Sequence, residues 1–139
     1  MTPIVVLLLL ARCASARLVN YETDSGAKAN DDAWETVWHN GAALNASLSS
    51  LHPGDVLLIP AKTFHLMGGI QAKNLESVVI QIDGTLEFAS TTLNAEKYIS
   101  GWPRSGPGST AGVLECMQFE NLTNVTFTSA GEGQLNGAG

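Results

Sequence analysis

Basic side chains are scarce in this sequence. The 139 residues contain 7 Lys and Arg against 13 Asp and Glu, which gives a formal net charge of -6 at pH 7. Beyond Lys73 the only basic residues are Lys97 and Arg104. Because nucleic-acid binding requires clustered positive charge to neutralise phosphates, this balance argues against a nucleic-acid partner.

Side chains that hold metals or cofactors are also few and scattered. No Asp follows Asp83, and every His precedes it: His39, His52 and His65. The histidines and Cys116 lack the close spacing of zinc motifs. Asp55 and Asp83 lie too far apart in the sequence to indicate a calcium site. The Gly-rich ending has Asn136 where a dinucleotide fingerprint needs its third glycine. We therefore expect no metal and no cofactor.

Hydrophobic runs long enough to span a bilayer, which takes about 20 residues, are missing. The apolar run Ile4–Ala11 is shorter, and the small residues Ala14-Ser15-Ala16 follow it. This pattern predicts a signal peptide over residues 1–16 that is cleaved after Ala16, although Met1-Thr2-Pro3 lacks a basic side chain. An N-terminal membrane anchor is the alternative. We expect a secreted, extracellular chain of residues 17–139 with no membrane attachment after cleavage.

Cysteine is almost absent, and three glycosylation sequons are present. Cys13 would leave with the signal peptide, so Cys116 is either a buried free thiol or pairs with a cysteine beyond Gly139. The sequons begin at Asn45, Asn121 and Asn124. Behind a signal peptide they predict N-glycosylation in a eukaryotic secretory route.

A single helix is expected near the N-terminus. Asp32 and Glu35 have the spacing of a capping box, with Asp32 as the N-cap. Apolar residues then follow helical spacing: Trp34, Val37, Trp38, Gly41, Leu44 and Leu48. Asn45 would share the face of Trp38, where a glycan cannot pack against a core. Either the helix ends near Leu44 or the sequon at Asn45 is empty.

The remainder reads as short strands separated by turns. Inward and outward side chains alternate around Phe64, Ile80, Leu86 and Phe127, and strand runs recur about every 20 to 25 residues with one longer interruption. This period predicts an all-β solenoid whose first coil is capped by the helix. A β-sandwich is the alternative fold. Because Gly131–Gly139 resembles the start of another coil, we expect residues 17–139 to be the N-terminal part of an incomplete domain.

Several motifs resemble the opening coils of pectin-lyase-fold proteins: Gly26-Ala27-Lys28, Asn30-Asp31-Asp32, Pro53–Pro60 and Thr63-Phe64. Two further stretches, Ile80–Leu86 and Phe119–Thr126 leading into Gly131–Gly139, are similar to polygalacturonases, family 28 of the glycoside hydrolases. That family usually has Ile and Asp where Leu135 and Asn136 stand. The resemblance covers nearly all of Val19–Gly139.

The resemblance implies a right-handed parallel β-helix and inverting hydrolysis of α-1,4-galacturonosyl bonds in pectin. Inversion requires one carboxylic acid to protonate the leaving oxygen and one carboxylate to activate water. The family supplies these groups from Asn-Thr-Asp and Asp-Asp motifs, beside Gly-His-Gly and Arg-Ile-Lys. None is present at a matching position, and Asp31-Asp32 belongs to the expected helix start. No residue of this chain is therefore assigned a catalytic role. Solvent-facing positions explain the late carboxylates better than catalysis: Glu115, Glu120 and Glu132.

Candidate substrate contacts lie in the long segment Thr91–Gly112, which is rich in Ser, Gly and Pro. Trp102 and Tyr98 can pack on a sugar ring, while Arg104 and Lys97 can bind a uronate carboxylate. Alternatively, Trp102 and Pro103 only anchor the segment to the barrel.

These observations predict the N-terminal part of a secreted polygalacturonase-like hydrolase, monomeric and inactive by itself, whose full-length form binds pectin or polygalacturonate. The alternative is a non-catalytic β-helix module that binds wall polysaccharide, or a degenerate enzyme relative.

Overall fold

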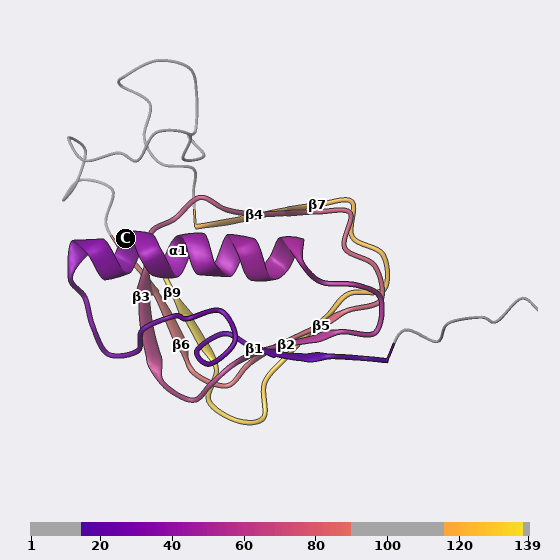
Figure 1. Ribbon diagram of the computed structural model, residues 1–139, viewed down its shortest axis with the longest axis horizontal. Helices are drawn as coiled ribbons and strands as arrows, with labels where there is room; N and C mark the ends of the chain where they lie inside the picture. Colours follow the sequence, from indigo (N-terminus) through magenta and orange to yellow (C-terminus); the bar gives the residue numbers. More distant parts are fainter. Residues whose placement is uncertain (1–14, 90–115, 138–139) are drawn as a thin grey trace, which may run out of the picture.

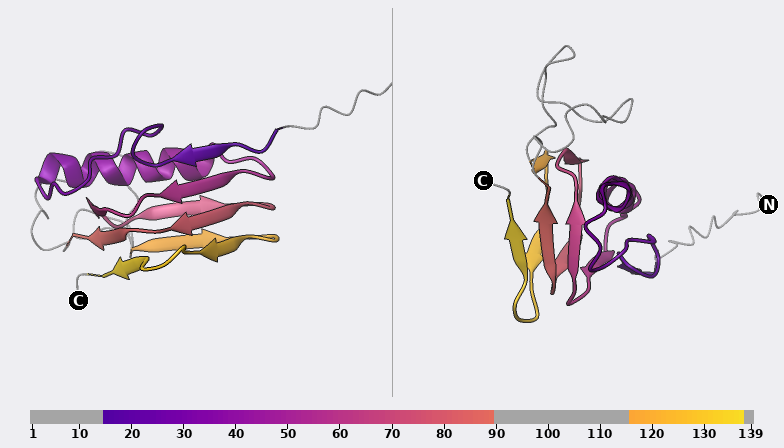
Figure 2. Two further views of the ribbon diagram at one scale, coloured as in Figure 1. Left: turned by 90° about the horizontal axis from the view of Figure 1, so that it is seen from below. Right: turned by 90° about the vertical axis from the view of Figure 1, so that its left-hand side faces the viewer.

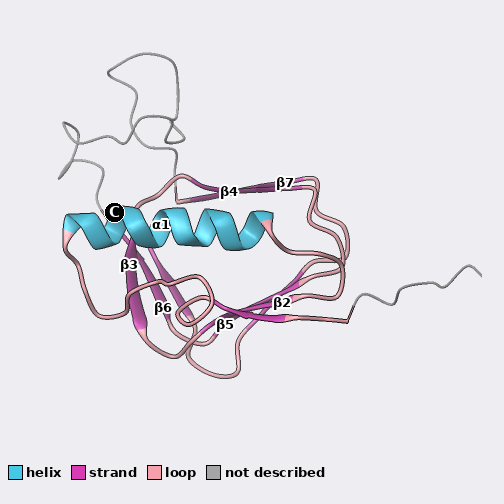
Figure 3. Ribbon diagram, viewed as in Figure 1, coloured by secondary structure: helices cyan, strands magenta, loops and turns pink. Residues whose placement is uncertain are grey.

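The computed structural model describes residues 15–89 and 116–137. These residues form short strands and one helix (Figure 3). The elements are β1 (Leu18–Asn20), α1 (Trp34–Ser49), β2 (Val56–Ile59), β3 (Thr63–Leu66), β4 (Ile70–Lys73), β5 (Val79–Ile82), β6 (Thr85–Phe88), β7 (Met117–Glu120), β8 (Thr126–Thr128) and β9 (Gln134–Asn136).

The strands form three parallel sheets, in the orders β1-β2-β5-β8, β3-β6-β9 and β4-β7. Seen along the stack, the sheets make three sides of a triangular outline (Figure 1). Each strand pairs with a strand one layer away, such as Leu57 with Ile80 and Phe64 with Leu86. Every pair in the described part of the chain is parallel. The hairpins of a β-sandwich would be antiparallel, so the described fold is that of stacked parallel sheets and is compatible with a β-helix.

Successive segments of the chain form successive layers. The first layer contains β2, β3 and β4, the second β5, β6 and β7, and the third β8 and β9. The helix α1 lies against one end of this stack, and β8 and β9 lie at the other (Figure 2). The long stretch of sequence between β6 and β7 accounts for the one longer spacing in the strand pattern. Val79 pairs with Val56, 23 residues earlier, and with Thr126, 47 residues later.

The helix α1 was predicted correctly, but its predicted N-cap was wrong. The N-cap position is Ala33, which makes no side-chain cap bond. Asp31 instead accepts hydrogen bonds from the Thr36 hydroxyl (2.6 Å) and from the backbone N–H of Ala33 (3.0 Å). These two bonds hold the pKa of Asp31 below its ordinary value. The preceding Asn30 adopts a left-handed conformation (φ 57°), which turns the chain so that Asp31 rather than Asp32 reaches the helix.

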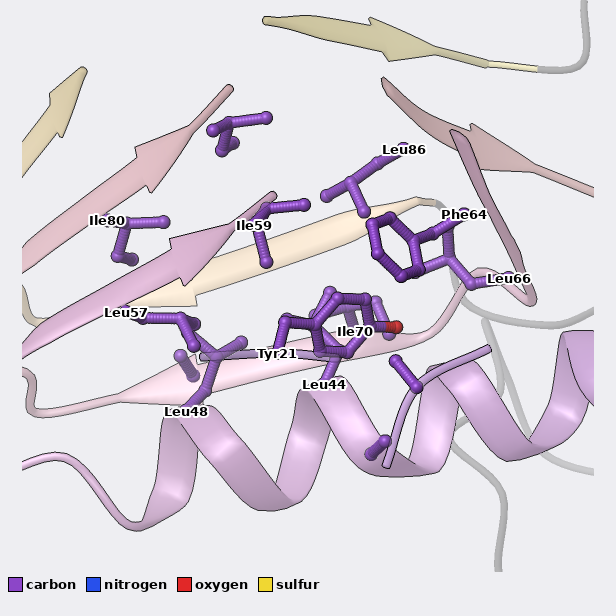
Figure 4. Close-up of a cluster of buried hydrophobic side chains, with 14 of the residues drawn as sticks. Tyr21, Leu44, Leu48, Leu57, Ile59, Phe64, Leu66, Ile70, Ile80 and Leu86 are labelled. Carbon is purple, nitrogen blue, oxygen red and sulfur yellow. The ribbon is translucent and has the colours of Figure 1, made fainter. Parts of the chain in front are cut away.

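The core fills the space between the sheets and beneath α1 (Figure 4). Alternate strand residues are buried, as the sequence predicted for Phe64, Ile80 and Leu86. Leu44 and Leu48 of α1 close the end of this core. Tyr21 is fully buried, packs its ring 5.0 Å from that of Phe64 and donates to the Asn40 carbonyl (2.6 Å). Burial raises the pKa of Tyr21 because the phenolate would lose its hydration.

Two turns with the same sequence pattern stack on each other between the layers. Asn74-Leu75-Glu76-Ser77-Val78 precedes β5, and Asn121-Leu122-Thr123-Asn124-Val125 precedes β8. The first and fourth residues of both turns have positive φ angles between 51° and 58°. Left-handed backbone is more tolerable for Asn than for most side chains, which explains the repeated Asn. The turns are joined by hydrogen bonds from Asn121 Nδ2 to Asn74 Oδ1 and from Asn124 Nδ2 to Ser77 Oγ.

Burial falls sharply at the third layer. Leu57 and Ile80 are 0% and 2% exposed, whereas Phe127, which pairs with Ile80, is 47% exposed. Likewise Leu86 is 1% exposed, and its partner Leu135 is 54% exposed. These exposed side chains occupy the register of core residues. The described third layer therefore presents an open apolar sheet edge.

Candidate functional site

The predicted sugar-contact residues lie outside the described part of the chain: Lys97, Tyr98, Trp102 and Arg104. The segment that carries them begins beyond Ala89, directly after β6, and ends before Cys116, directly ahead of β7. Chain connectivity thus fixes both of its attachment points on the second layer.

A polar groove of about 200 Å³ crosses the turns that join the first sheet to the second. Each layer contributes one turn to it, so its wall is built from residues far apart in sequence. The lining residues are Ala61, Lys62, Thr63, Asp83, Gly84, Thr85, Glu132 and Gln134. Glycine is required in this stack, because a Cβ on Gly84 would collide with the Pro60 and Lys62 backbone, and one on Gly133 with the Ile82 carbonyl.

Most charged groups of this groove are already engaged. Asp83 accepts from the side chain of Gln81 (2.8 Å) and from the backbone N–H of Ala130 (2.7 Å). Lys62 donates to both carboxylate oxygens of Glu22, at 2.7 and 2.8 Å. Glu132 is exposed at the groove. The arrangement can hold a polar ligand, but Asp83 is occupied in linking the second layer to the third.

A wider cavity of about 600 Å³ lies between β1 and the second half of α1. Its wall mixes hydroxyl groups with small apolar side chains: Arg17, Leu18, Val19, Asp24, Ser25, Ala43, Ala46, Ser47 and Ser50. The hydroxyls of Ser25 and Ser47 are hydrogen-bonded to each other (2.5 Å). Among the described residues of its lining Asp24 is the only acidic one, so they contain no carboxylate pair.

The one carboxylate that is nearly inaccessible among the described residues is Asp55, which is 2% exposed. Arg17 donates to it from Nη2 (2.7 Å), Nε (3.2 Å) and its backbone N–H (3.0 Å), and the backbone N–H of His52 donates at 2.8 Å. The Arg17 guanidinium, with help from the two backbone donors, holds the pKa of Asp55 well below its usual range despite burial. This ion pair ties the start of β1 to the turn before β2.

The three sequons occupy different environments. The helix continues through Asn45 to Ser49, which removes one of the two alternatives for that residue. Asn45 Nδ2 donates to the Gly69 carbonyl (3.2 Å), and its Oδ1 accepts from Gln71 N–H (2.8 Å). Its side chain therefore joins α1 to β4. Asn121 and Asn124 are exposed in the stacked turn before β8.

Other candidate chemistry is sparse in the described residues. No three His, Cys, Asp or Glu side chains there gather in a way that could hold a metal ion. Cys116 is half-buried against the core and forms no disulfide within residues 15–89 and 116–137. Glu120 pairs with Lys73 on the neighbouring strand (2.9 Å). No helix in the described ranges is long and apolar enough to cross a membrane.

No family model matches this chain, and no curated protein or solved structure is significantly similar to it.

Sequence reasoning missed two features of these sites. The Arg17–Asp55 pair joins residues 38 positions apart, and no local spacing signals such a contact. The groove was detectable in principle, because Asp83-Gly84-Thr85 and Glu132-Gly133-Gln134 have the same pattern of carboxylate, glycine and polar residue. Thr85 pairs with Gln134 in the second sheet, which brings the two triplets into register.

Proposed function

We propose that this chain is the N-terminal part of a secreted polygalacturonase-like glycoside hydrolase, built as a right-handed parallel β-helix that acts on pectin. The observation that carries the proposal is the position of the motifs that resemble that family. Asp83-Gly84 and Glu132-Gly133 lie in equivalent turns of adjacent layers, where glycine is sterically required. In a solenoid each coil repeats the same turn, so a motif that recurs at this turn is what such a fold requires.

The open third layer supports a longer β-helix. Phe127 and Leu135 are about half exposed although their partners Ile80 and Leu86 are buried. An uncovered apolar edge of this kind is an aggregation hazard that natural sheets cover or blunt. A further coil of the same architecture would cover both side chains.

The proposed reaction is inverting hydrolysis of α-1,4-galacturonosyl bonds. A carboxylic acid protonates the departing glycosidic oxygen, while a carboxylate removes a proton from the water that attacks the opposite face of the sugar. No described carboxylate is assigned either role. The catalytic pair would then belong to coils beyond the described layers, and the present chain alone would be inactive.

Substrate binding is proposed for the segment between β6 and β7. Trp102 and Tyr98 would pack against pyranose faces, and Arg104 and Lys97 would bind uronate carboxylates. Local positive charge of this kind is needed because the chain as a whole has a formal charge of -6 and pectin is itself anionic.

A non-catalytic wall-binding module is the second candidate. It is favoured by the engagement of Asp83 with Gln81 and Ala130, and of Glu120 with Lys73, which gives these carboxylates structural partners. Such a module would bind polygalacturonate without cleaving it.

Release of reducing ends from polygalacturonate tests the proposal. The secreted chain should give none, whereas a chain extended by whatever in-frame codons the transcript holds after Gly139 should hydrolyse the polymer with inversion at the anomeric carbon; a stop codon directly after Gly139 would favour the second candidate. Retention of polygalacturonate by the extended chain without hydrolysis would establish the binding module instead. Arg104→Ala should weaken retention in both cases, with Lys28→Ala, an exposed lysine near α1, as the charge-matched control.

A further inference from the structure

The strongest unassigned feature of the molecule is the environment of the Arg17 backbone nitrogen. This nitrogen lies 3.0 Å from Oδ1 of Asp55, a carboxylate that is 2% exposed. Ser15 and Ala16, which precede it, are both exposed. The peptide bond between Ala16 and Arg17 is therefore accessible, while its nitrogen, which belongs to Arg17, faces the buried carboxylate of Asp55.

We propose that hydrolysis of the Ala16–Arg17 bond converts this nitrogen into an ammonium group that forms an ion pair with Asp55. The inference rests on the proposed secretion of the chain but not on pectin hydrolysis. A processing peptidase adds water across the bond: the hydroxyl joins the Ala16 carbonyl carbon, the C–N bond breaks, and the Arg17 nitrogen gains a proton. At neutral pH this amine takes up a second proton and becomes a cation.

The geometry is already suited to that cation before cleavage. Oδ1 of Asp55 accepts from the Arg17 nitrogen, while Oδ2 accepts from the guanidinium and from His52 N–H. The two oxygens thus face separate donors, and the new charge would add to the bond that occupies Oδ1. Charge-assisted hydrogen bonds are stronger than neutral ones, and most so where water is excluded from one partner.

Three elements meet at this position. The Arg17 guanidinium donates to the Ser50 carbonyl at the end of α1 (2.8 Å), and the carbonyl of Arg17 accepts from Val56 N–H at the start of β2 (2.9 Å). Asp55 in turn accepts at its backbone carbonyl from Val79 N–H of β5 (3.0 Å). The new charge would therefore lie where β1 already meets α1 and the first two layers.

The charged groups around Asp55 are few. Its carboxylate faces the Arg17 guanidinium at 2.7 Å and the His52 imidazole at 3.8 Å. The His52 side chain is 72% exposed and its Nδ1 lies 3.3 Å from Nη2 of Arg17, so Arg17 is the main cationic partner of Asp55. The new ammonium would share the carboxylate with the guanidinium by occupying the other oxygen.

The test begins with the full chain secreted from a eukaryotic host, whose N-terminal residue is identified by mass spectrometry. We expect Arg17. The rate of acetylation of the N-terminal amine at pH 7 is then measured with the exposed Lys28 amine as internal reference. Because an ion pair keeps the amine protonated and unreactive, we expect acetylation about tenfold slower than in a variant with Gly-Ser inserted between Ala16 and Arg17.

Two substitutions separate the ammonium from the guanidinium. Asp55→Asn should abolish the slow acetylation, whereas Arg17→Gln should preserve it, since the amine remains while the guanidinium is lost. If Asp55→Asn fails to fold, the insertion and Arg17→Gln still decide the matter. An N-terminus other than Arg17, or equal acetylation rates in the native chain and the insertion variant, would overturn the proposal. Failure of pectin hydrolysis would leave these results unaffected.

Discussion

Asn40 is a buried polar residue whose removal should disturb this fold strongly. It lies on α1, is fully buried, and joins three separate segments. Its Oδ1 accepts from Lys28 N–H (2.8 Å), and its Nδ2 donates to the carbonyls of Lys28 (2.9 Å) and His65 (2.8 Å). The side chain thus bonds the loop before α1, the helix itself and β3 together. We expect Asn40→Ala to leave one donor and two acceptors without partners.

The magnitude follows from these three bonds. Each intramolecular hydrogen bond contributes about 1 kcal/mol net, so their loss costs about 3 kcal/mol. Replacing Asn by Ala within a helix returns about 0.5 kcal/mol of propensity. The free energy of unfolding should therefore fall by about 2 to 3 kcal/mol, a large share of the roughly 5–15 kcal/mol typical of a whole domain.

Urea unfolding of the secreted chain, followed by far-UV circular dichroism, measures this change. Ser49→Ala is the matched control, because Ser49 is exposed on the same helix and bonds only within it, to the Ala46 carbonyl. That control should change the free energy of unfolding by less than about 0.5 kcal/mol. If Asn40→Ala were no more destabilising than Ser49→Ala, the buried amide would not hold the three segments together.

The turns, the buried carboxylate and the sequons each allow a further test. Gly84→Ala should destabilise the chain by about 2 kcal/mol or more because its Cβ meets backbone, whereas Gly131→Ala, whose Cβ meets nothing within 4 Å, should be tolerated; thermal melting of both variants checks this. Asp55 has a lowered pKa when folded, so its contribution is complete above the unfolded value of about 4 and is lost as the pH falls below it. Asp55→Asn should therefore flatten the acid limb of a stability–pH curve, and an unchanged limb would contradict that linkage. Glycopeptide mapping of the secreted chain should find Asn45 unmodified because this side chain is half-buried and bonds α1 to β4, while Asn121 and Asn124 are exposed; a fully occupied Asn45 would contradict the helix-to-β4 link.

Much of the secondary structure could be predicted from local patterns. The helix was evident from the apolar spacing of Val37, Trp38 and Leu44, all of which are buried. Alternation placed Phe64 and Leu66 inward and His65 outward. Helix faces and strand faces are read from periods of 3.6 and 2 residues, and these periods hold here because the first two layers each bury one side of their strands. The strand β4 was missed because its alternation has only two inward residues, Ile70 and Ala72, which is too short to identify a strand by its pattern alone.

The candidate site was predicted less well. The sugar contacts proposed for Trp102 and Arg104 lie outside the described residues, so they stay predictions. The groove across Lys62, Asp83 and Glu132 depends on three turns coming into register, which requires the sheets to have formed. The bonds that Lys62 makes to Glu22 and that Asp83 makes to Gln81 likewise depend on how the chain packs.

The amino-acid sequence by itself determined which side chains of the first two layers face inward, where glycine and asparagine turn the chain, and that one amphipathic helix lies near the N-terminus. These are local properties, set by backbone sterics and by the spacing of apolar residues. Only the tertiary structure decided that β5 lies between β2 and β8, and that Arg17 reaches Asp55. Those contacts join residues that the chain separates, and they are chosen by the burial and charge of the whole assembly rather than by any neighbouring residue.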